Sequence, residues 1–209
     1  MAASLSGYDA PVSTQEWVQP VVLEGRRVRL EPLRAEHFDD LAAVAFDRVS
    51  GQWSAPGDLD EAGRRGGMAV ALANADAGLE LPFATVDRST GRAVGSTRFM
   101  SIVPEHRRLE IGWTWLGRAF QRSGLNREAK LLQLAHGFEV LGANRVEFKT
   151  HALNHRSRTA LAGIGATFEG VFRNHMILPD GSIRHSAYFS VIAEEWPAVK
   201  VALIADLDR

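Results

Sequence analysis

Residues 107–132 read RRLEIGWTWLGRAFQRSGLNREAKLL and join two patterns without a break. In 107–116 apolar and polar residues alternate, with Leu109 and Trp113 on one face and Glu110 on the other, which is the period of a β-strand. A loop that contains glycine follows, and the next residues have the composition of a helix. A strand joined by a short loop to a helix predicts the first half of a parallel strand–helix–strand crossover.

The segments on either side extend this pattern to the whole chain. In the helix expected at 126–142, the polar stripe consists of Asn126, Lys130, Gln133 and Gly137. We expect the other helices at 35–48, 60–77, 155–164 and after Pro197, and the strands at 21–33, 81–87, 92–100, 107–116 and 143–152 and in a closing hairpin around the turn PDGS. This order predicts an α/β fold with a mixed, mostly antiparallel sheet of about seven strands flanked by helices. We expect residues 1–20 to form an N-terminal arm and 21–209 a single domain.

Composition limits the classes of function. The chain has 209 residues and a formal net charge of -1. It has no cysteine, so thiolate nucleophiles and zinc–thiolate sites are excluded. The balanced charge gives no electrostatic reason to expect nucleic acid or an anionic membrane as a partner. The first residues lack the basic start and apolar core of a secretory signal, and we expect a cytoplasmic protein with no membrane span. The seven scattered histidines do not form a metal-ligand set, so no metal is expected.

The loop before the central helix is a candidate anion site. Helix N-termini carry free N–H groups and the positive end of the helix dipole, and Gly124 would let an anion approach the backbone closely. Arg122 and Arg127 add positive charge there. The alternative is an ordinary strand–helix turn capped by Asn126. Neither the Walker motif nor the three-glycine dinucleotide motif is present.

The loop resembles the pyrophosphate loop of the GCN5-related N-acetyltransferases (GNAT), which runs Gln/Arg-x-x-Gly-x-Gly/Ala. Gln121 and Gly124 match it, and Asn126 replaces the last small residue, a departure also typical of a subset that resembles the bacterial ribosomal-protein N-terminal acetyltransferases RimJ and RimL. Three further stretches resemble this family in the family's order: EGRRVRLEPLRAEHFDDL, RRLEIGWTWL and NRVEFKTHALNHRSRTALAGIGATFEGV. The resemblance covers roughly residues 22 to 197.

The resemblance implies a GNAT-type fold in which the fourth and fifth strands splay apart and acetyl-CoA lies between them. It implies that the pyrophosphate meets the loop backbone, that the pantetheine arm pairs with the end of the fourth strand, and that an asparagine side chain reaches the arm. The implied cofactor-binding residues are Trp115, Leu116, Gln121, Arg122, Ser123, Gly124, Leu125, Asn126, Arg127 and Asn154. The amine would then attack the thioester directly, without a covalent enzyme intermediate.

The catalytic candidates each have a structural alternative. Ser157 takes the position of a serine in the ribosomal-protein subset, where it would protonate the leaving thiolate, or it forms only a helix-start hydrogen bond. The general base is open between Glu110, His151 and His175, each of which could instead be structural. Trp53, in a Gly/Pro-containing loop, could line the acceptor pocket.

Two classes of function remain open. The first is an acetyltransferase whose acceptor is a protein N-terminus or a small-molecule amine, and the second is a catalytically silent acyl-CoA-binding module that regulates a partner. A serine hydrolase is excluded because the sequence has no Gly-x-Ser-x-Gly elbow. The closing hairpin and the tail around Trp196 offer apolar surface, so a homodimer is also expected.

Overall fold

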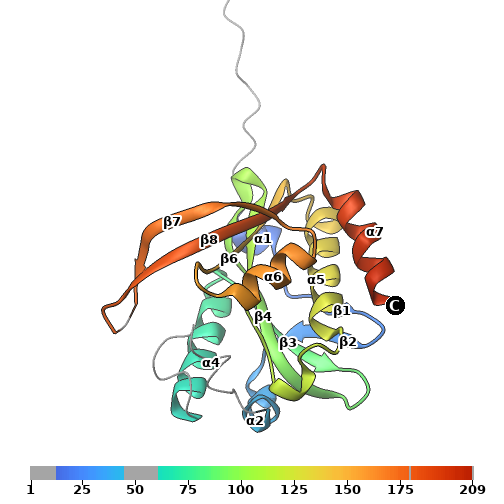
Figure 1. Ribbon diagram of the computed structural model, residues 1–209. Helices are drawn as coiled ribbons and strands as arrows, with labels where there is room; N and C mark the ends of the chain where they lie inside the picture. Colours follow the sequence, from blue (N-terminus) through green and yellow to red (C-terminus); the bar gives the residue numbers. More distant parts are fainter. Residues whose placement is uncertain (1–12, 45–60, 179, 209) are drawn as a thin grey trace, which may run out of the picture.

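The computed structural model describes residues 13–44, 61–178 and 180–208 (Figure 1). Its centre is one eight-stranded sheet with the order β1-β2-β3-β4-β5-β6-β8-β7. The strands are β1 (Leu23–Glu24), β2 (Val28–Pro32), β3 (Leu81–Asp87), β4 (Arg92–Val103), β5 (Arg108–Leu116), β6 (Arg145–His151), β7 (Thr167–Ile177) and β8 (Ile183–Ile192). Only β5 and β6 pair in parallel, and the other neighbours are antiparallel. The mixed, mostly antiparallel sheet is therefore confirmed, and the additional strand arises because the segment expected as one strand at 21–33 turns back on itself at Gly25.

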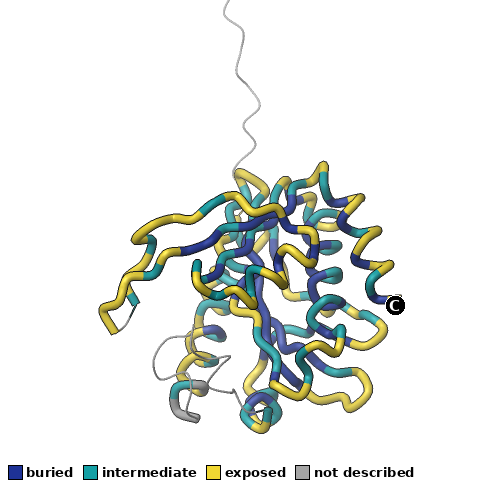
Figure 2. The backbone as a smooth tube through the Cα atoms, in the orientation of Figure 1, coloured by how far each residue is buried: buried dark blue, intermediate teal, exposed yellow. Residues whose placement is uncertain are grey.

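Helices cover both faces of the sheet. They are α1 (Thr14–Trp17), α2 (Phe38–Ala43), α4 (Glu61–Asp76), α5 (Leu125–Ala135), α6 (His155–Gly163) and α7 (Trp196–Leu207). Apolar residues of α5, α6 and α7 pack with Phe83 and Phe148 in the main core, which appears as the dark centre of Figure 2. A smaller cluster joins α2 and α4 to Ala84, and because Phe83 and Ala84 are adjacent in a strand, the two clusters lie on opposite faces.

The ends of the described chain are tied to this core. Trp17 in α1 donates its ring N–H to the carbonyl of Leu141 at 2.9 Å, and Val18 is buried. The helix expected after Pro197 is α7, but Trp196 at its start is buried and bonded to Glu139. Trp196 itself is therefore not part of the apolar surface expected around it, which α7 offers instead at Val201 and Ile204.

A buried carboxylate anchors the turn between β1 and β2 to the first turn of α5. Glu128 accepts the backbone N–H groups of Arg26 at 2.7 Å, Arg27 at 2.9 Å and Val28 at 2.9 Å. A Cβ at Gly25 would lie 2.7 Å from the Glu128 carboxyl carbon, so the turn requires glycine there. This contact holds the N-terminal end of α5 in place beside the candidate anion loop.

A β-bulge interrupts the regular alternation of β5. Ser96 lies opposite Trp115 and Arg98 opposite Gly112, so two residues of β5, Trp113 and Thr114, face one residue of β4. Trp113 has φ 49° and is 53% exposed, so it does not share the buried face of Leu109 as the strand period predicted. The positive φ at Trp113 bends β5, so the second half of the strand runs in a different direction from the first half.

The pairing of β5 with β6 ends before this bulge. The register runs from Arg108 opposite Arg145 to Glu110 opposite Glu147, and over the described residues no later pair joins the two strands. The sheet therefore opens between β5 and β6, where the resemblance placed a splay.

Lys130 and Gln133, which belong to the polar stripe expected on the central helix, lie inside the molecule and bond to each other. Lys130 is 3% exposed, and its Nζ donates to Thr97 Oγ1 at 3.1 Å, Thr114 Oγ1 at 2.7 Å and Gln133 Oε1 at 3.0 Å. Thr114 belongs to the bulge and Thr97 is the residue opposite it. The Lys130 ammonium thus links α5 to both strands at the bulge. Burial lowers the pKa of Lys130 to about 7.

This burial predicts a pH-dependent contribution to stability. Between about pH 7 and 10.5 the unfolded chain binds a proton that the folded chain has released, so folding becomes more favourable as pH rises. We expect the free energy of unfolding of the wild type, minus that of Lys130→Met, to increase from pH 7 to 10 in urea titrations. The exposed-site variant Lys200→Met controls for the loss of a positive charge, and a Lys130→Met difference that stays constant with pH would contradict the account.

Candidate active site

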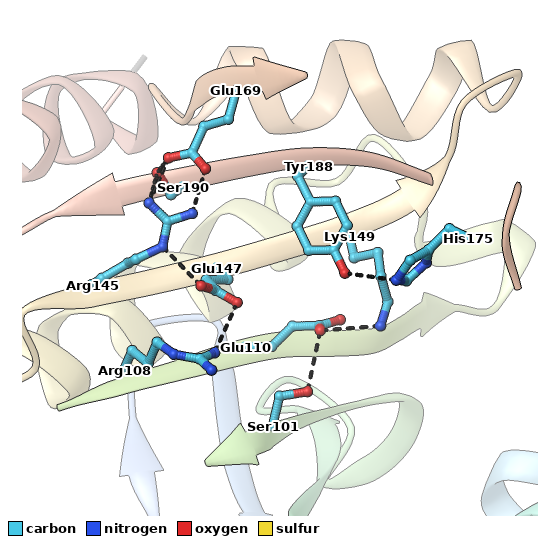
Figure 3. Close-up of polar contacts among 10 residues, drawn as sticks. All are labelled: Ser101, Arg108, Glu110, Arg145, Glu147, Lys149, Glu169, His175, Tyr188 and Ser190. Atoms are coloured by element: carbon cyan, nitrogen blue, oxygen red, sulfur yellow. Dashed lines mark hydrogen bonds and ion pairs between the residues drawn. The ribbon is translucent and has the colours of Figure 1, made fainter. Parts of the chain in front are cut away.

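A polar surface lines the sheet on both sides of the opening (Figure 3). In β6, Val146, Phe148 and Thr150 are buried toward the core, so the alternate residues face the other way. These alternate residues are Arg145, Glu147, Lys149 and His151, and the register sets Glu147 opposite Ser190 and Lys149 opposite Tyr188 of β8. The strand period therefore places a row of ionisable groups on one face of the sheet.

Glu110 lies where the pairing of β5 and β6 ends. Its side chain is buried, with Lys149 Nζ 3.3 Å and Ser101 Oγ 3.4 Å from Oε2. Burial raises the pKa of the Glu110 carboxyl above its ordinary value, and Lys149 opposes that rise. A Cβ at Gly112 would come within 3.1 Å of Glu110 Oε1, so glycine leaves room beside the carboxylate. Of the three candidate general bases, Glu110 is the one that lies where the opening between β5 and β6 begins.

His175 reaches the same face because β7 contains a second bulge. Phe172 lies opposite Ser186 and Met176 opposite Arg184, so three residues of β7 face His185. His175 Nδ1 lies 3.0 Å from Ser186 Oγ. Burial lowers the pKa of His175, and the positive charges of Lys149 and Arg184 lower it further.

Tyr188 was missed as a site residue by the sequence reasoning. Its hydroxyl lies 3.3 Å from His175 Nε2, and its ring lies 4.4 Å from that of Phe172. Burial raises the pKa of the Tyr188 hydroxyl, and the nearby carboxylate of Glu110 adds to this. The available signal was the strand period of the closing hairpin, which sets Tyr188 on the same face as Ser186.

His151 ends β6 and shapes the turn into α6. Its Nδ1 accepts the backbone N–H of Leu153 at 3.1 Å. Burial lowers the pKa of His151, and the charges of Arg184 and His185 contribute. The hydrogen bond shows a structural role for this candidate base.

The candidate anion loop begins α5 with a left-handed glycine. Gly124 has φ 87° and is the N-cap, while Asn126 lies inside the helix, so the expected Asn126 cap is wrong. Ser123 Oγ lies 3.4 Å from the N–H of Leu125 and donates to the carbonyl of Phe120 at 2.6 Å. In the described part of the chain, the backbone N–H groups of Gly124, Asn126 and Arg127 have no hydrogen-bond partner.

Side chains of the loop brace it against neighbouring elements. Gln121 donates to the carbonyl of Leu116 at 3.1 Å and accepts from Arg156 of α6 at 3.2 Å, which links β5 to α6. Arg127 forms an ion pair with Asp206 of α7. Arg122 is exposed and has φ 60°.

Asn154 is the N-cap of α6, as the sequence predicted. Its Oδ1 accepts the N–H of Ser157 at 3.0 Å. Ser157 is half-buried, and its hydroxyl has no hydrogen bond to the described residues. Both residues follow β6 directly, so they lie at the carboxyl end of the strand that borders the opening.

The tryptophans differ from one another in environment. Trp115 packs on the small cluster under α2 and α4. The Arg98 guanidinium lies 5.0 Å from the centre of the Trp113 ring. Trp53 lies outside the described residues. Within those residues, no helix has the length and apolar character needed to cross a bilayer.

Comparison with known proteins agrees with this geometry. Residues 27–167 match the family model described as an acetyltransferase (GNAT) domain. YoaA of Bacillus subtilis (strain 168), an uncharacterised N-acetyltransferase, is 30% identical over 89 residues, which are 43% of this chain and 50% of YoaA. The chain thus spans about half the length of this curated relative.

Two solved structures extend the likeness to most of the chain. A GCN5-related N-acetyltransferase from Brucella melitensis has a TM-score of 0.82 and 35% identity, with 91% of this chain and 86% of that chain covered. RimJ from Mycobacterium smegmatis, solved with CoA-disulfide, has a TM-score of 0.73 and 23% identity, with 90% and 95% covered, and this likeness concerns the fold. The chain therefore belongs to the GNAT acetyltransferase family.

Proposed function

We propose that the chain moves an acetyl group from acetyl-CoA directly to an amine. The observation that carries the proposal is the opening between β5 and β6 after Glu110, beside the N-terminus of α5. The opened edge of β5 has the backbone groups with which an extended arm can pair. The proposal is supported by the binding of CoA-disulfide in the M. smegmatis structure, whose fold this chain shares.

The residues at the opening fit this co-substrate. The N–H groups at the start of α5 would bind the pyrophosphate, and a positive φ at Gly124 lets them cluster without a side chain above them. Trp115 and Leu116 would pair with the arm, and Asn154 would hold it from the side of α6. When bound, acetyl-CoA supplies the activated acetyl thioester.

Two groups would move the protons of the reaction. Glu110 would accept the proton of the attacking amine, directly or through one water, because burial has already raised its affinity for a proton. Ser157 would donate a proton to the departing sulfur as the C–S bond breaks and the C–N bond forms. Lys149 holds the Glu110 carboxylate in place, and Tyr188 with His175 supplies a second hydroxyl on this face.

The acceptor and the assembly belong to the proposal as well. The acceptor is a protein N-terminus, as in the subset that RimJ and RimL represent, or a small-molecule amine. We also propose a homodimer formed through the β7–β8 hairpin, which extends from the body in Figure 1 and exposes Phe172, Ile177 and Ile183. Its outer strand β7 is a sheet edge.

Gly124→Val should abolish tight CoA binding. The new side chain would lie where the phosphate approaches and 3.0 Å from Arg27 Nη1, so we expect the dissociation constant by calorimetry to rise at least about tenfold. Gly142→Val is the matched control, because Gly142 also has positive φ, has open space around it and follows the π-helix His136–Val140 that continues α5. Unchanged CoA affinity in a folded Gly124→Val protein would refute the site.

Glu110→Gln should remove the ascending limb of the pH profile of kcat/KM. The raised pKa places this limb above the ordinary range of a glutamate, and loss of the base should slow the reaction by roughly 100- to 10,000-fold. His175→Gln should keep the limb. If the limb disappears in His175→Gln and persists in Glu110→Gln, the base is the histidine.

Ser157→Ala should lower kcat while the CoA dissociation constant and melting temperature stay near those of the wild type. Such a pattern marks an interaction made mainly in the transition state. Tyr188→Phe is measured in parallel, because it removes the other hydroxyl of the site without changing the ring. An intact kcat with lowered stability in Ser157→Ala would make Ser157 a structural residue only.

The dimer should appear in sedimentation velocity at micromolar concentration. Charged substitutions at two hairpin positions, Ile177→Glu with Ile183→Glu, should convert it to monomer because both side chains are exposed and lie opposite each other. A monomer throughout the wild-type concentration series would exclude this assembly.

A further inference from the structure

An open cavity of about 800 Å³ lies at the β7 bulge, beside the proposed reaction centre. Its lining residues are Phe172, Arg173, Asn174, His175 and His185. His175 connects it to Tyr188, and the N–H of Asn174 donates to His185 Nδ1 at 2.8 Å. Basic and polar side chains surround an aromatic ring, and no lining residue is acidic.

Arg184 does not line the cavity, but it brings a further positive charge close to His175, which does. It lies in β8 opposite Met176 and shares the face of Ser186 and Tyr188 by strand period. Its charge lowers the pKa of both His151 and His175, so it lies near each of them. The side chain is half-buried, and its Nε is fully buried without a hydrogen-bond partner.

The other strand cations of this face have carboxylate partners. Arg108 and Arg145 contact Glu147, and Lys149 contacts Glu110. Arg184 makes no ion pair with any residue that the structure describes. A partly buried guanidinium without a carboxylate partner is costly unless a ligand supplies a negative charge beside it.

The charges near the reaction centre therefore do not balance. The positive groups on this face are Arg108, Arg145, Lys149 and Arg184, and the negative groups are Glu110, Glu147 and Glu169, so positive groups exceed negative ones by one. An amine arrives mostly as a cation, so this excess of positive charge repels an acceptor that has no other charge. A single carboxylate on the acceptor would remove the repulsion, and guanidinium groups bind carboxylates in a two-pronged geometry.

We propose that Arg184, together with Arg173 and His185 of the cavity, forms a subsite for a carboxylate carried by the acceptor amine. The preferred acceptors are then amino-acid-like compounds in which a carboxylate lies a few bonds from the amine, with Phe172 beside the acceptor side chain. This inference rests on the proposed acetyl transfer, and it adds the substrate class.

The first test compares matched acceptors. L-amino acids and their carboxamides are offered with acetyl-CoA, and kcat/KM is expressed per unprotonated amine because the two sets differ in amine pKa. We expect the carboxylates to be preferred by at least about tenfold, the value of one charge-assisted contact. In Arg184→Gln the preference should fall to within about twofold, because the carboxylates lose their partner and the carboxamides lose a charge that repels them.

Arg92→Gln is the matched control, since it removes an arginine that lies in an exposed ion pair with Asp40. It should keep the full preference. Equal use of both sets by the wild type, or an undiminished preference in Arg184→Gln, would overturn the subsite. A stronger preference for 2-aminoethyl phosphate over 2-aminoethanol than for any carboxylate would also overturn it, because the anion would then be a phosphate.

The second test separates the subsite from the reaction. N-acetyl amino acids and their amides, which correspond to products, are titrated by calorimetry into protein saturated with CoA. We expect the acids to bind the wild type and to lose at least about tenfold in affinity in Arg184→Gln. Binding of the acids without turnover of any amine would refute the proposed function and support the subsite. Turnover of amines with no difference between acids and amides in binding would refute the subsite and leave the function.

Discussion

The end of β5–β6 pairing at Glu110 is the constraint on which the rest of the structure depends. A parallel pair that continued to Leu116 would satisfy its own backbone groups and leave no place for a strand-like ligand. The bulge at Trp113 and Thr114 turns β5 away, so a short irregularity in one strand creates the opening. The helix N-terminus, the cap of α6 and the Glu110 carboxylate are then all placed by the strands that border it.

Buried charges hold this arrangement. Lys130 joins α5 to both strands of the bulge through three oxygen acceptors, and Glu128 joins α5 to the β1–β2 turn through three backbone N–H groups. Neither group contacts the proposed reaction centre. Each fixes the helix that presents the anion loop, so the central helix is positioned by polar contacts in addition to its apolar side.

The sequence predicted the elements well because their patterns are local. The order of strands and helices, the cap at Asn154 and the glycine of the loop follow from period and from turn chemistry. The failures have a common cause, which is that local patterns do not show where a partner element lies. The polar stripe of α5 gives no sign that Lys130 is buried, and the alternation of β5 gives no sign of the bulge that exposes Trp113. Tyr188 was missed because its neighbour His175 reaches it only through the bulge in β7.

The account is tested most directly by amide hydrogen exchange with and without CoA. If the arm pairs with the opened edge, CoA should slow exchange at Leu116, whose N–H faces away from β4, and at the first residues of α5, Asn126 and Arg127. The amides of β3 and β4, which are already paired on both sides, should exchange at the same rate in both states. Protection that appears elsewhere, with 115–127 unchanged by saturating CoA, would contradict the claim that the opening between β5 and β6 is the cofactor site.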